Sequence, residues 1–284
     1  MTKYIPPIQR KEGTAFGRTY HYYIDGDNKR IPGVTTIIGD GIPKPKLINW
    51  AGRATAEGAI DQWDELTELP PAKRLKKLEG IRYEDRDKAA DKGTQIHLYG
   101  EALVQGIEVR GIPDELRGHV DNYVQFIDAW KLDPVLVEAV VVNYTRGYAG
   151  TLDLIADLDS PTGERQRLLL DIKTGATGVF SETALQLAAY RNAEYYVDAD
   201  GDEQPMIAVD GCAAIHVTAD DCQLLPAAEN FRIDETHQRT TFEMFRVAQM
   251  VYQYAKETEK SGLILPALRL PTASTARVIW DDDQ

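Results

Sequence analysis

Apolar residues follow helical spacing in the first half of the chain and gather into short continuous runs in the middle. From Pro45 to Glu65, and again from Asp114 to Trp130, they recur at the three- and four-residue intervals that place them on one helix face. A charged segment from Lys73 to Lys92 leads into another helical pattern, which carries Ile96 and Leu103. These intervals predict a largely helical amino-terminal part.

The first forty residues add two short elements to this part. His21–Ile24 is rich in aromatic residues and is followed by the turn residues Asp25–Asn28, a pattern typical of a β-hairpin. The next stretch, Pro32–Ile38, begins with a turn signal and is expected to continue into a short helix.

Strand-like runs dominate the middle of the chain. They are β-branched or leucine-rich, and turn residues such as those of 159–163 separate them. The predicted strands are Val135–Asn143, Gly147–Asp157 and Arg167–Thr174. After them we expect a helix from Ser181, a plausible N-cap, to about Tyr196.

The last third of the chain predicts a hairpin and a long helix. The hairpin pairs Cys212–Thr218 with Cys222–Pro226, and the helix covers about Glu235–Glu259. Neither an internal repeat nor a linker-like stretch is evident. We therefore expect a single domain over residues 1–284, with an amino-terminal part (1–92), a core (93–260) and an irregular tail (261–284).

Two acidic residues lie inside the apolar runs of neighbouring predicted strands. Asp153 interrupts one run and Asp171 follows Leu168–Leu170 in the next. Buried carboxylates are costly unless something pairs with them, and two neighbouring carboxylates repel each other. A divalent cation between them removes both problems, and oxygen ligands are those that Mg²⁺ or Mn²⁺ prefers. Lys173 shares a strand face with Asp171 and can assist an attacking water.

Composition and charge narrow the possible functions. The net charge of −13 opposes passive coating of nucleic acid, although the first fifty residues carry eight Lys and Arg against four Asp and Glu. Two cysteines, Cys212 and Cys222, lack the spacing of a zinc site or a disulfide framework. The sequence contains neither a signal peptide nor an apolar run of membrane-spanning length, so we expect a soluble, cytoplasmic protein without membrane association.

These residues resemble the PD-(D/E)xK nuclease superfamily, most closely its RecB-type branch, which includes phage recombination exonucleases. That branch carries a His on an upstream helix, then G-x-x-D, D/E-x-K and Q-x-x-x-Y. The matching residues here are His97, Gly150 with Asp153, Asp171 with Lys173, and Gln186 with Tyr190. The resemblance implies an α/β fold with a restriction-endonuclease-like core, in which helices flank a central mixed β-sheet, and a helical amino-terminal part.

The resemblance also implies the roles of the site residues. His97, Asp153, Asp171 and the Ile172 carbonyl would bind Mg²⁺ or Mn²⁺, and Lys173 would align the attacking water. Gln186 would hydrogen-bond near the metal or Lys173, and Tyr190 would contact a phosphate. Members that hold an iron–sulfur cluster use four cysteines, so no such cluster is expected in this chain. Glu138, an acid in an apolar strand, either reaches the site or lies exposed at a sheet edge.

The leading hypothesis is a metal-dependent DNA exonuclease, phage-encoded and acting in recombination, replication or DNA-end processing. A structure-selective endonuclease or resolvase on the same core is the first alternative, and a catalytically retired DNA-binding protein is the second. A sugar- or nucleotide-binding α/β protein would need a glycine-rich phosphate loop, and the sequence has none. Besides DNA, the expected partners are a single-strand-annealing recombinase or a helicase, and the oligomeric state is left open.

Overall fold

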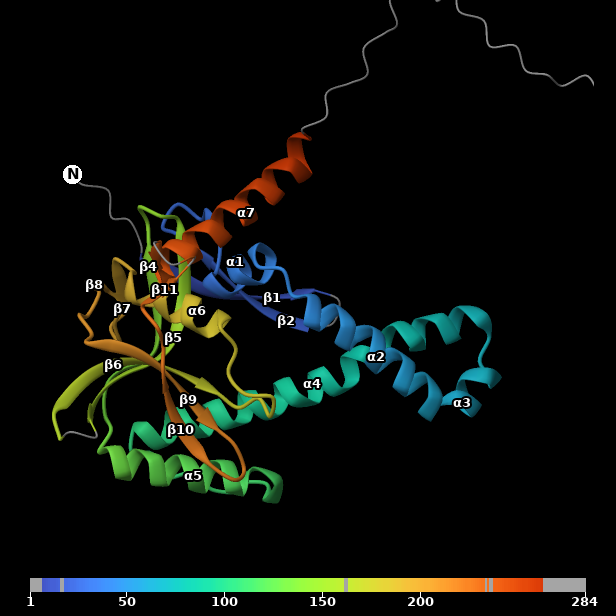
Figure 1. Cartoon of the computed structure of the whole chain (residues 1–284), viewed down its shortest axis with the longest axis horizontal. Helices are drawn as coiled ribbons and strands as arrows, with labels where there is room; N and C mark the ends of the chain where they lie inside the picture. Colours follow the sequence, from blue (N-terminus) through green and yellow to red (C-terminus); the bar gives the residue numbers. More distant parts are fainter. Residues whose placement is uncertain (1–6, 16–17, 161–162, 233, 235–236, 263–284) are drawn as a thin grey trace, which may run out of the picture.

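A central seven-stranded sheet organises the chain. The computed structural model describes residues 7–15, 18–160, 163–232, 234 and 237–262 (Figure 1). The sheet has the order β10-β9-β6-β5-β4-β7-β8, and β6 pairs with β9 in parallel while the other pairs are antiparallel. Its strands are β4 (Asp133–Asn143), β5 (Tyr148–Asp159), β6 (Arg165–Lys173), β7 (Tyr195–Val197), β8 (Glu203–Pro205), β9 (Gly211–Val217) and β10 (Cys222–Pro226). The predicted α/β class with a central mixed sheet is confirmed.

Helices cover both faces of this sheet (Figure 1). On one face lie α1 (Val34–Gly41), α6 (Glu182–Arg191) and α7 (Thr241–Ser261). On the other lie α5 (Asp114–Trp130) and the end of α4 (Pro71–Val104). Because both faces are buried, the central strands are apolar at successive positions instead of alternating with polar residues.

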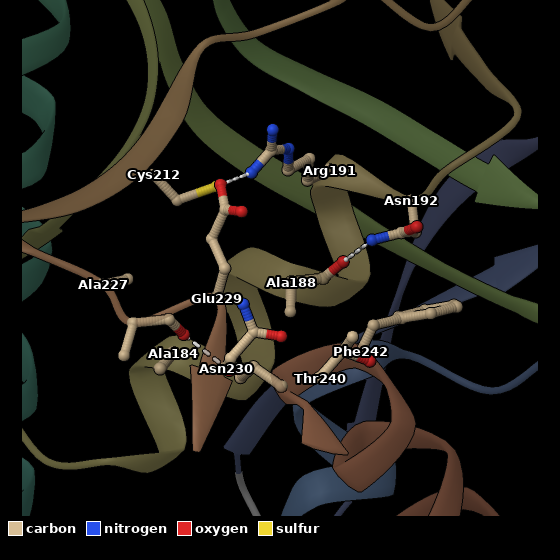
Figure 2. A pocket seen from close by; sticks show the side chains of 12 residues that line it. Ala184, Ala188, Arg191, Asn192, Cys212, Ala227, Glu229, Asn230, Thr240 and Phe242 are labelled. Atoms are coloured by element: carbon tan, nitrogen blue, oxygen red, sulfur yellow. Dashed lines mark hydrogen bonds and ion pairs between the residues drawn. The ribbon is translucent and has the colours of Figure 1, made fainter. Parts of the chain in front are cut away.

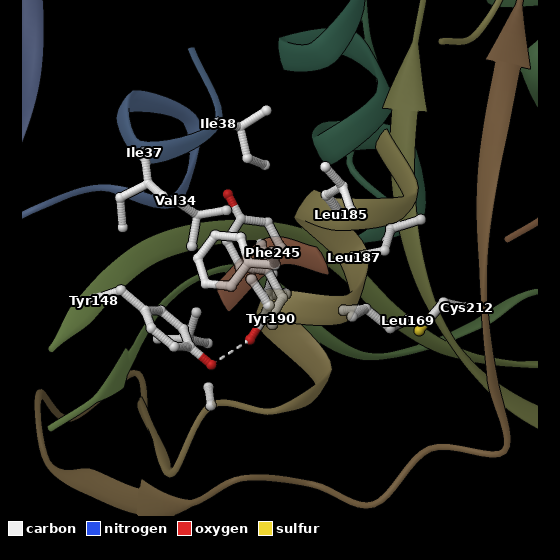
Figure 3. Close-up of a cluster of buried hydrophobic side chains, with 14 of the residues drawn as sticks. Val34, Ile37, Ile38, Tyr148, Leu169, Leu185, Leu187, Tyr190, Cys212 and Phe245 are labelled. Atoms are coloured by element: carbon white, nitrogen blue, oxygen red, sulfur yellow. Dashed lines mark hydrogen bonds between the residues drawn. The ribbon is translucent and has the colours of Figure 1, made fainter. Parts of the chain in front are cut away.

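Neighbouring residues of one strand serve the two faces in turn. Ile155 and Leu169 pack with α1, α6 and α7 in a cluster that includes Phe245 and Tyr148 (Figure 3). The adjacent Leu154 and Leu170 pack on the other face against α4 and α5. The two cores fix which way each strand residue points, and they therefore fix the direction of Asp153 and Asp171 as well.

The amino-terminal strands form a separate three-stranded sheet of β1 (Gln9–Ala15), β2 (Arg18–Ile24) and β3 (Arg30–Ile31). The predicted hairpin is confirmed as β2–β3, and the Asp25 carboxylate accepts the turn N–H groups of Asp27 and Lys29. Strand β1 was not expected, because its sequence QRKEGTA is almost entirely polar. Its pairing with β2 supplies the stability that its own residues lack.

The predicted helix from Pro45 to Glu65 is two helices, α2 (Pro45–Asp61) and α3 (Trp63–Glu68). The charged segment at 73–92 is not a separate lead-in: it belongs to α4, which runs unbroken for 34 residues. Lys, Arg, Leu and Glu are good helix formers, so this polar segment continues the helix. Helix α4 therefore crosses the expected boundary at residue 92, while α2, α3 and the start of α4 project from the body (Figure 1).

Two helix ends differ from expectation. Helix α6 ends at Arg191 and not near Tyr196, because Tyr195–Val197 pairs with β4 as strand β7. Helix α7 begins at Thr241 and not near residue 235: Thr240 and Glu243 form a capping box, and β11 (Asn230–Arg232) pairs with β12 (Gln238–Thr240) before it. The predicted irregular tail lies almost wholly at residues 263–284, outside the described residues. None of the described helices combines the length and the apolar character that crossing a membrane requires.

Candidate metal site

The two predicted acids lie on adjacent strands, β5 and β6, where the ladder between these strands ends. The last paired residues are Leu154 and Leu170. One residue beyond them, a side chain replaces the backbone carbonyl as the hydrogen-bond acceptor: the Asp153 Oδ2 accepts the N–H of Ile172 at 2.8 Å. The side chain of Ile172 is buried in the core, as expected. The Asp153 carboxylate is thereby held at the point where β5 and β6 part.

Three side chains from three elements converge beside that point. His97 of α4, Glu138 of β4 and Asp153 of β5 each offer one ligand atom, and these three atoms lie within 4.8 Å of one another. The His97 Nδ1 is 3.7 Å from the Asp153 Oδ2. All three residues are half-buried. Two carboxylates and an imidazole form a donor set that fits Mn²⁺ well and Mg²⁺ acceptably, so these residues are able to hold a divalent cation.

Glu138 is the acid whose position the sequence left undecided between the site and an exposed sheet edge, and the structure places it at the site. The pairs Val137–Leu154 and Ala139–Leu152 flank it, which places it opposite Asp153. Its φ of 48° is in the left-handed region, which is unusual for a strand residue other than glycine and is concentrated at functional sites. Burial and the neighbouring Asp153 raise the pKa of Glu138 to about 7. The Arg10 charge opposes this rise without cancelling it, so the Glu138 carboxylate is only partly compensated by positive charge.

A second chain of contacts joins the remaining predicted residues. The Asp171 side chain is 2% exposed, and its Oδ2 forms an ion pair with the Lys173 ammonium. The Gln186 Nε2 donates to the Asp171 Oδ1 at 2.7 Å, and the Lys173 Nζ lies 3.5 Å from the Gln186 Oε1. Burial and the nearby Asp153 raise the pKa of Asp171 to about 7, although Lys173 opposes the rise. Asp171 is outside the group of three ligands, so its metal contact and that of the Ile172 carbonyl stay predictions.

Tyr190 lies next to Gln186, and the position of its ring explains why the G-x-x-D motif has a glycine at position 150. Its ring is almost fully buried, and its hydroxyl is 3.5 Å from the Gln186 Nε2. A Cβ on Gly150 would come within 2.4 Å of the Tyr190 ring, so only glycine allows this approach. Burial raises the pKa of Tyr190 far above its usual value, and the phenol stays protonated. Its predicted contact with a phosphate remains a prediction.

Five of the residues described above line a cavity of about 860 Å³: His97, Glu138, Asp153, Gln186 and Tyr190. Helix α4 also contributes Glu101 to the lining, and the β1–β2 hairpin contributes Arg10, His21 and Tyr23. The Tyr23 hydroxyl is 3.0 Å from the Thr151 Oγ1, which ties the hairpin to β5. Neither the hairpin nor Glu101 was expected at this site: the hairpin lies far from the motifs in sequence, and Glu101, one helical turn after His97, is outside the motif pattern.

A second, smaller cavity of about 260 Å³ lies beside α6 (Figure 2). Alanines and the buried Cys212 line much of it, and its Arg191 and Glu229 neutralise each other in an ion pair. Among the described residues, only the group of His97, Glu138 and Asp153 brings three potential ligands together. The chemistry is thus concentrated in the larger cavity.

The repulsion at Glu138 gives a testable effect on stability. An acid whose pKa is higher in the folded than in the unfolded state loses stability as pH rises between the two values, here from about 4.5 to about 7. In EDTA we expect Glu138→Gln to raise the Tm at pH 8 by roughly 2–4 °C, the shift for about 1 kcal/mol, and to leave it almost unchanged at pH 4.5. Calorimetry at both pH values measures this, and a lower Tm of the variant at pH 8 would contradict it.

The chain was also compared with known proteins. It matches no protein-family model, and no curated protein is similar to it at a significant level. Its function is therefore inferred from its own residues and their geometry.

Proposed function

We propose that this chain is a metal-dependent deoxyribonuclease with a PD-(D/E)xK core, which hydrolyses DNA from its ends. One observation carries the proposal. A group that fits a divalent cation, His97–Glu138–Asp153, lies beside a buried carboxylate that is ion-paired with a lysine, Asp171–Lys173. The two acids come from adjacent strands of a mixed sheet, as the motif spacing predicts.

The roles of the residues follow from their positions. A cation held by the group of three would polarise a phosphodiester and favour ionisation of an attacking water. The Lys173 side chain is about one-third exposed, so it is not enclosed in the core. Its contacts with Asp171 and Gln186 fix its position before substrate arrives, which is the condition for strong electrostatic stabilisation of a charged transition state. Gln186 acts by holding Lys173 and Asp171 in register.

The acidic residues near the site favour a metal-dependent nuclease over a protein that only binds DNA. Glu101, Glu138 and Asp153 all line the cavity, and together they repel a phosphate backbone. A bound divalent cation offsets this repulsion, so DNA affinity at this cavity is expected to depend on metal. A retired nuclease would lack a metal-binding acid or the lysine, whereas this chain keeps them all.

The walls of the cavity favour a DNA end over the interior of a duplex. Helix α4 borders it through residues 90–101, and the β1–β2 hairpin also borders it. We expect linear DNA to be consumed progressively in Mg²⁺ or Mn²⁺ while covalently closed circles survive. Electrophoresis of an end-labelled linear fragment mixed with its closed circular form measures both rates in one tube.

Circles cut once with a restriction enzyme, or nicked on one strand, serve as the control, since they differ from the closed form only in having an end or a break. Rapid nicking of closed circles at moderate salt would assign the chain to the endonuclease alternative instead.

A further inference from the structure

The β1–β2 hairpin contributes to the cavity an arginine, Arg10, that the nuclease motifs do not include. In the β1–β2 ladder Arg10 pairs with Tyr23 and Glu12 pairs with His21. Paired residues share one face of a ladder, and so do residues two apart, so all four side chains are on one face. The bond between Tyr23 and Thr151 turns that face toward β5. Arg10 and His21 accordingly line the same cavity as Asp153.

Charge sets Arg10 apart from the other residues of the cavity. Among the described residues that line it, Arg10 is the one arginine or lysine. No ion pair joins Arg10 to a carboxylate in the part of the chain that the structure describes, whereas His21 is 3.6 Å from Glu12. Arg10 therefore supplies positive charge to a cavity whose carboxylates are Glu101, Glu138 and Asp153.

We propose that Arg10 binds a backbone phosphate of the DNA strand, next along from the phosphodiester held at the metal group. A guanidinium offers paired donors that match phosphate geometry, and those of Arg10 have no partner among the described residues. A DNA strand that is held at the metal group and extends to the β1–β2 hairpin brings a second phosphate to Arg10. Arg10 is then a positioning residue, which fixes the register of the strand. This inference rests on the proposed function for the identity of the polymer.

The chain supplies a matched control one residue away. Lys11 is exposed, carries the same charge and lies in the same strand, but strand alternation points it to the opposite face, where it pairs with Tyr22. If Arg10 acted only through the general positive charge of the hairpin, replacing either Arg10 or Lys11 would weaken DNA binding equally. A phosphate contact inside the cavity involves Arg10 alone.

Binding is measured by fluorescence anisotropy, with a labelled single-stranded oligonucleotide and Ca²⁺ in place of the catalytic cation. We expect Arg10→Ala to raise the Kd roughly 10-fold, Arg10→Lys to restore part of the loss, and Lys11→Ala to stay within about 2-fold of the wild type. The slope of log Kd against log salt should become shallower by about one unit in Arg10→Ala. Equal unfolding temperatures of the variants show that the hairpin is intact.

Oligonucleotides with one neutral methylphosphonate linkage locate the contact. At one position in the DNA, the neutral linkage should weaken binding to the wild-type protein about as much as Arg10→Ala weakens binding of the normal DNA. The same linkage should cause no further loss of affinity in the Arg10→Ala protein. Wild-type affinity in Arg10→Ala, or an equal loss in Lys11→Ala, overturns the inference. DNA binding that depends on Arg10 in a protein that hydrolyses no DNA in Mg²⁺ or Mn²⁺ would retain this contact and refute the proposed function instead.

Discussion

Asp153→Asn is expected to reduce DNA hydrolysis by about 10³-fold and to remove most of the affinity for Mn²⁺. Asp153 has two functions in the structure: it belongs to the group that fits a cation, and its Oδ2 accepts the N–H of Ile172 where β5 and β6 part. The neutral amide keeps the size of the side chain but supplies neither the charge nor the second acceptor. Single-turnover hydrolysis of labelled linear DNA, at several Mn²⁺ concentrations, measures the loss.

Asp157→Asn is the matched control, because Asp157 lies four residues further along the same strand. Its carboxylate binds Arg167 at 2.7 Å and does not line the cavity that contains Asp153. We expect the control to retain activity close to that of the wild type. If both variants lost activity equally, the loss would reflect a general effect of replacing an aspartate in β5. The role given to Asp153 would then lose its support.

Lys173→Met is expected to lower the rate of hydrolysis by about 10²-fold or more while Mn²⁺ affinity stays within a few-fold of the wild type. The loss of one preorganised electrostatic group has that scale. Lys173 contacts Asp171 and Gln186 but is not one of the three converging ligands, so its removal affects the chemistry more than the binding of metal. Without Lys173 the pKa of Asp171 should rise further, because that cation opposes the effect of burial.

Lys131→Met provides the comparison for this variant. Lys131 also forms an ion pair with an aspartate, Asp159, at 2.8 Å, but this pair is exposed on the surface. Exposed ion pairs contribute little to stability, so we expect the stability and the activity of Lys131→Met to be nearly unchanged. If the Lys173 variant hydrolyses DNA at the wild-type rate, transition-state stabilisation must come from another group.

The sequence was sufficient to predict the strands that carry the site. An acid within an apolar run is costly to bury, and that cost made Asp153 and Asp171 conspicuous. The structure places them on adjacent strands, and the chain of contacts from Lys173 to Gln186 to Tyr190 follows the predicted motif. The glycine at position 150 is explained only by the structure, since the close approach of the Tyr190 ring leaves no space for a Cβ.

Other parts of the site could not be predicted, because they depend on tertiary pairing. Glu138 faces Asp153 through the register of β4 and β5 and through a left-handed φ, neither of which the local sequence specifies. Arg10 reaches the cavity because β1 pairs with β2, and the polar sequence of β1 conceals that pairing. Helix ends were displaced for similar reasons: the pairing of β7 with β4 terminates α6, and a capping box sets the start of α7.

Titration of Mn²⁺ into the metal-free wild type and into the Asp153→Asn and Lys173→Met variants, by isothermal calorimetry, tests the central claim most directly. The claim is that the group of His97, Glu138 and Asp153 binds a divalent cation, and that Lys173 serves the chemistry that depends on it. We predict saturable binding by the wild type, similar binding by Lys173→Met and little or none by Asp153→Asn. Wild-type affinity in Asp153→Asn, or DNA hydrolysis that persists undiminished in EDTA, would contradict the account.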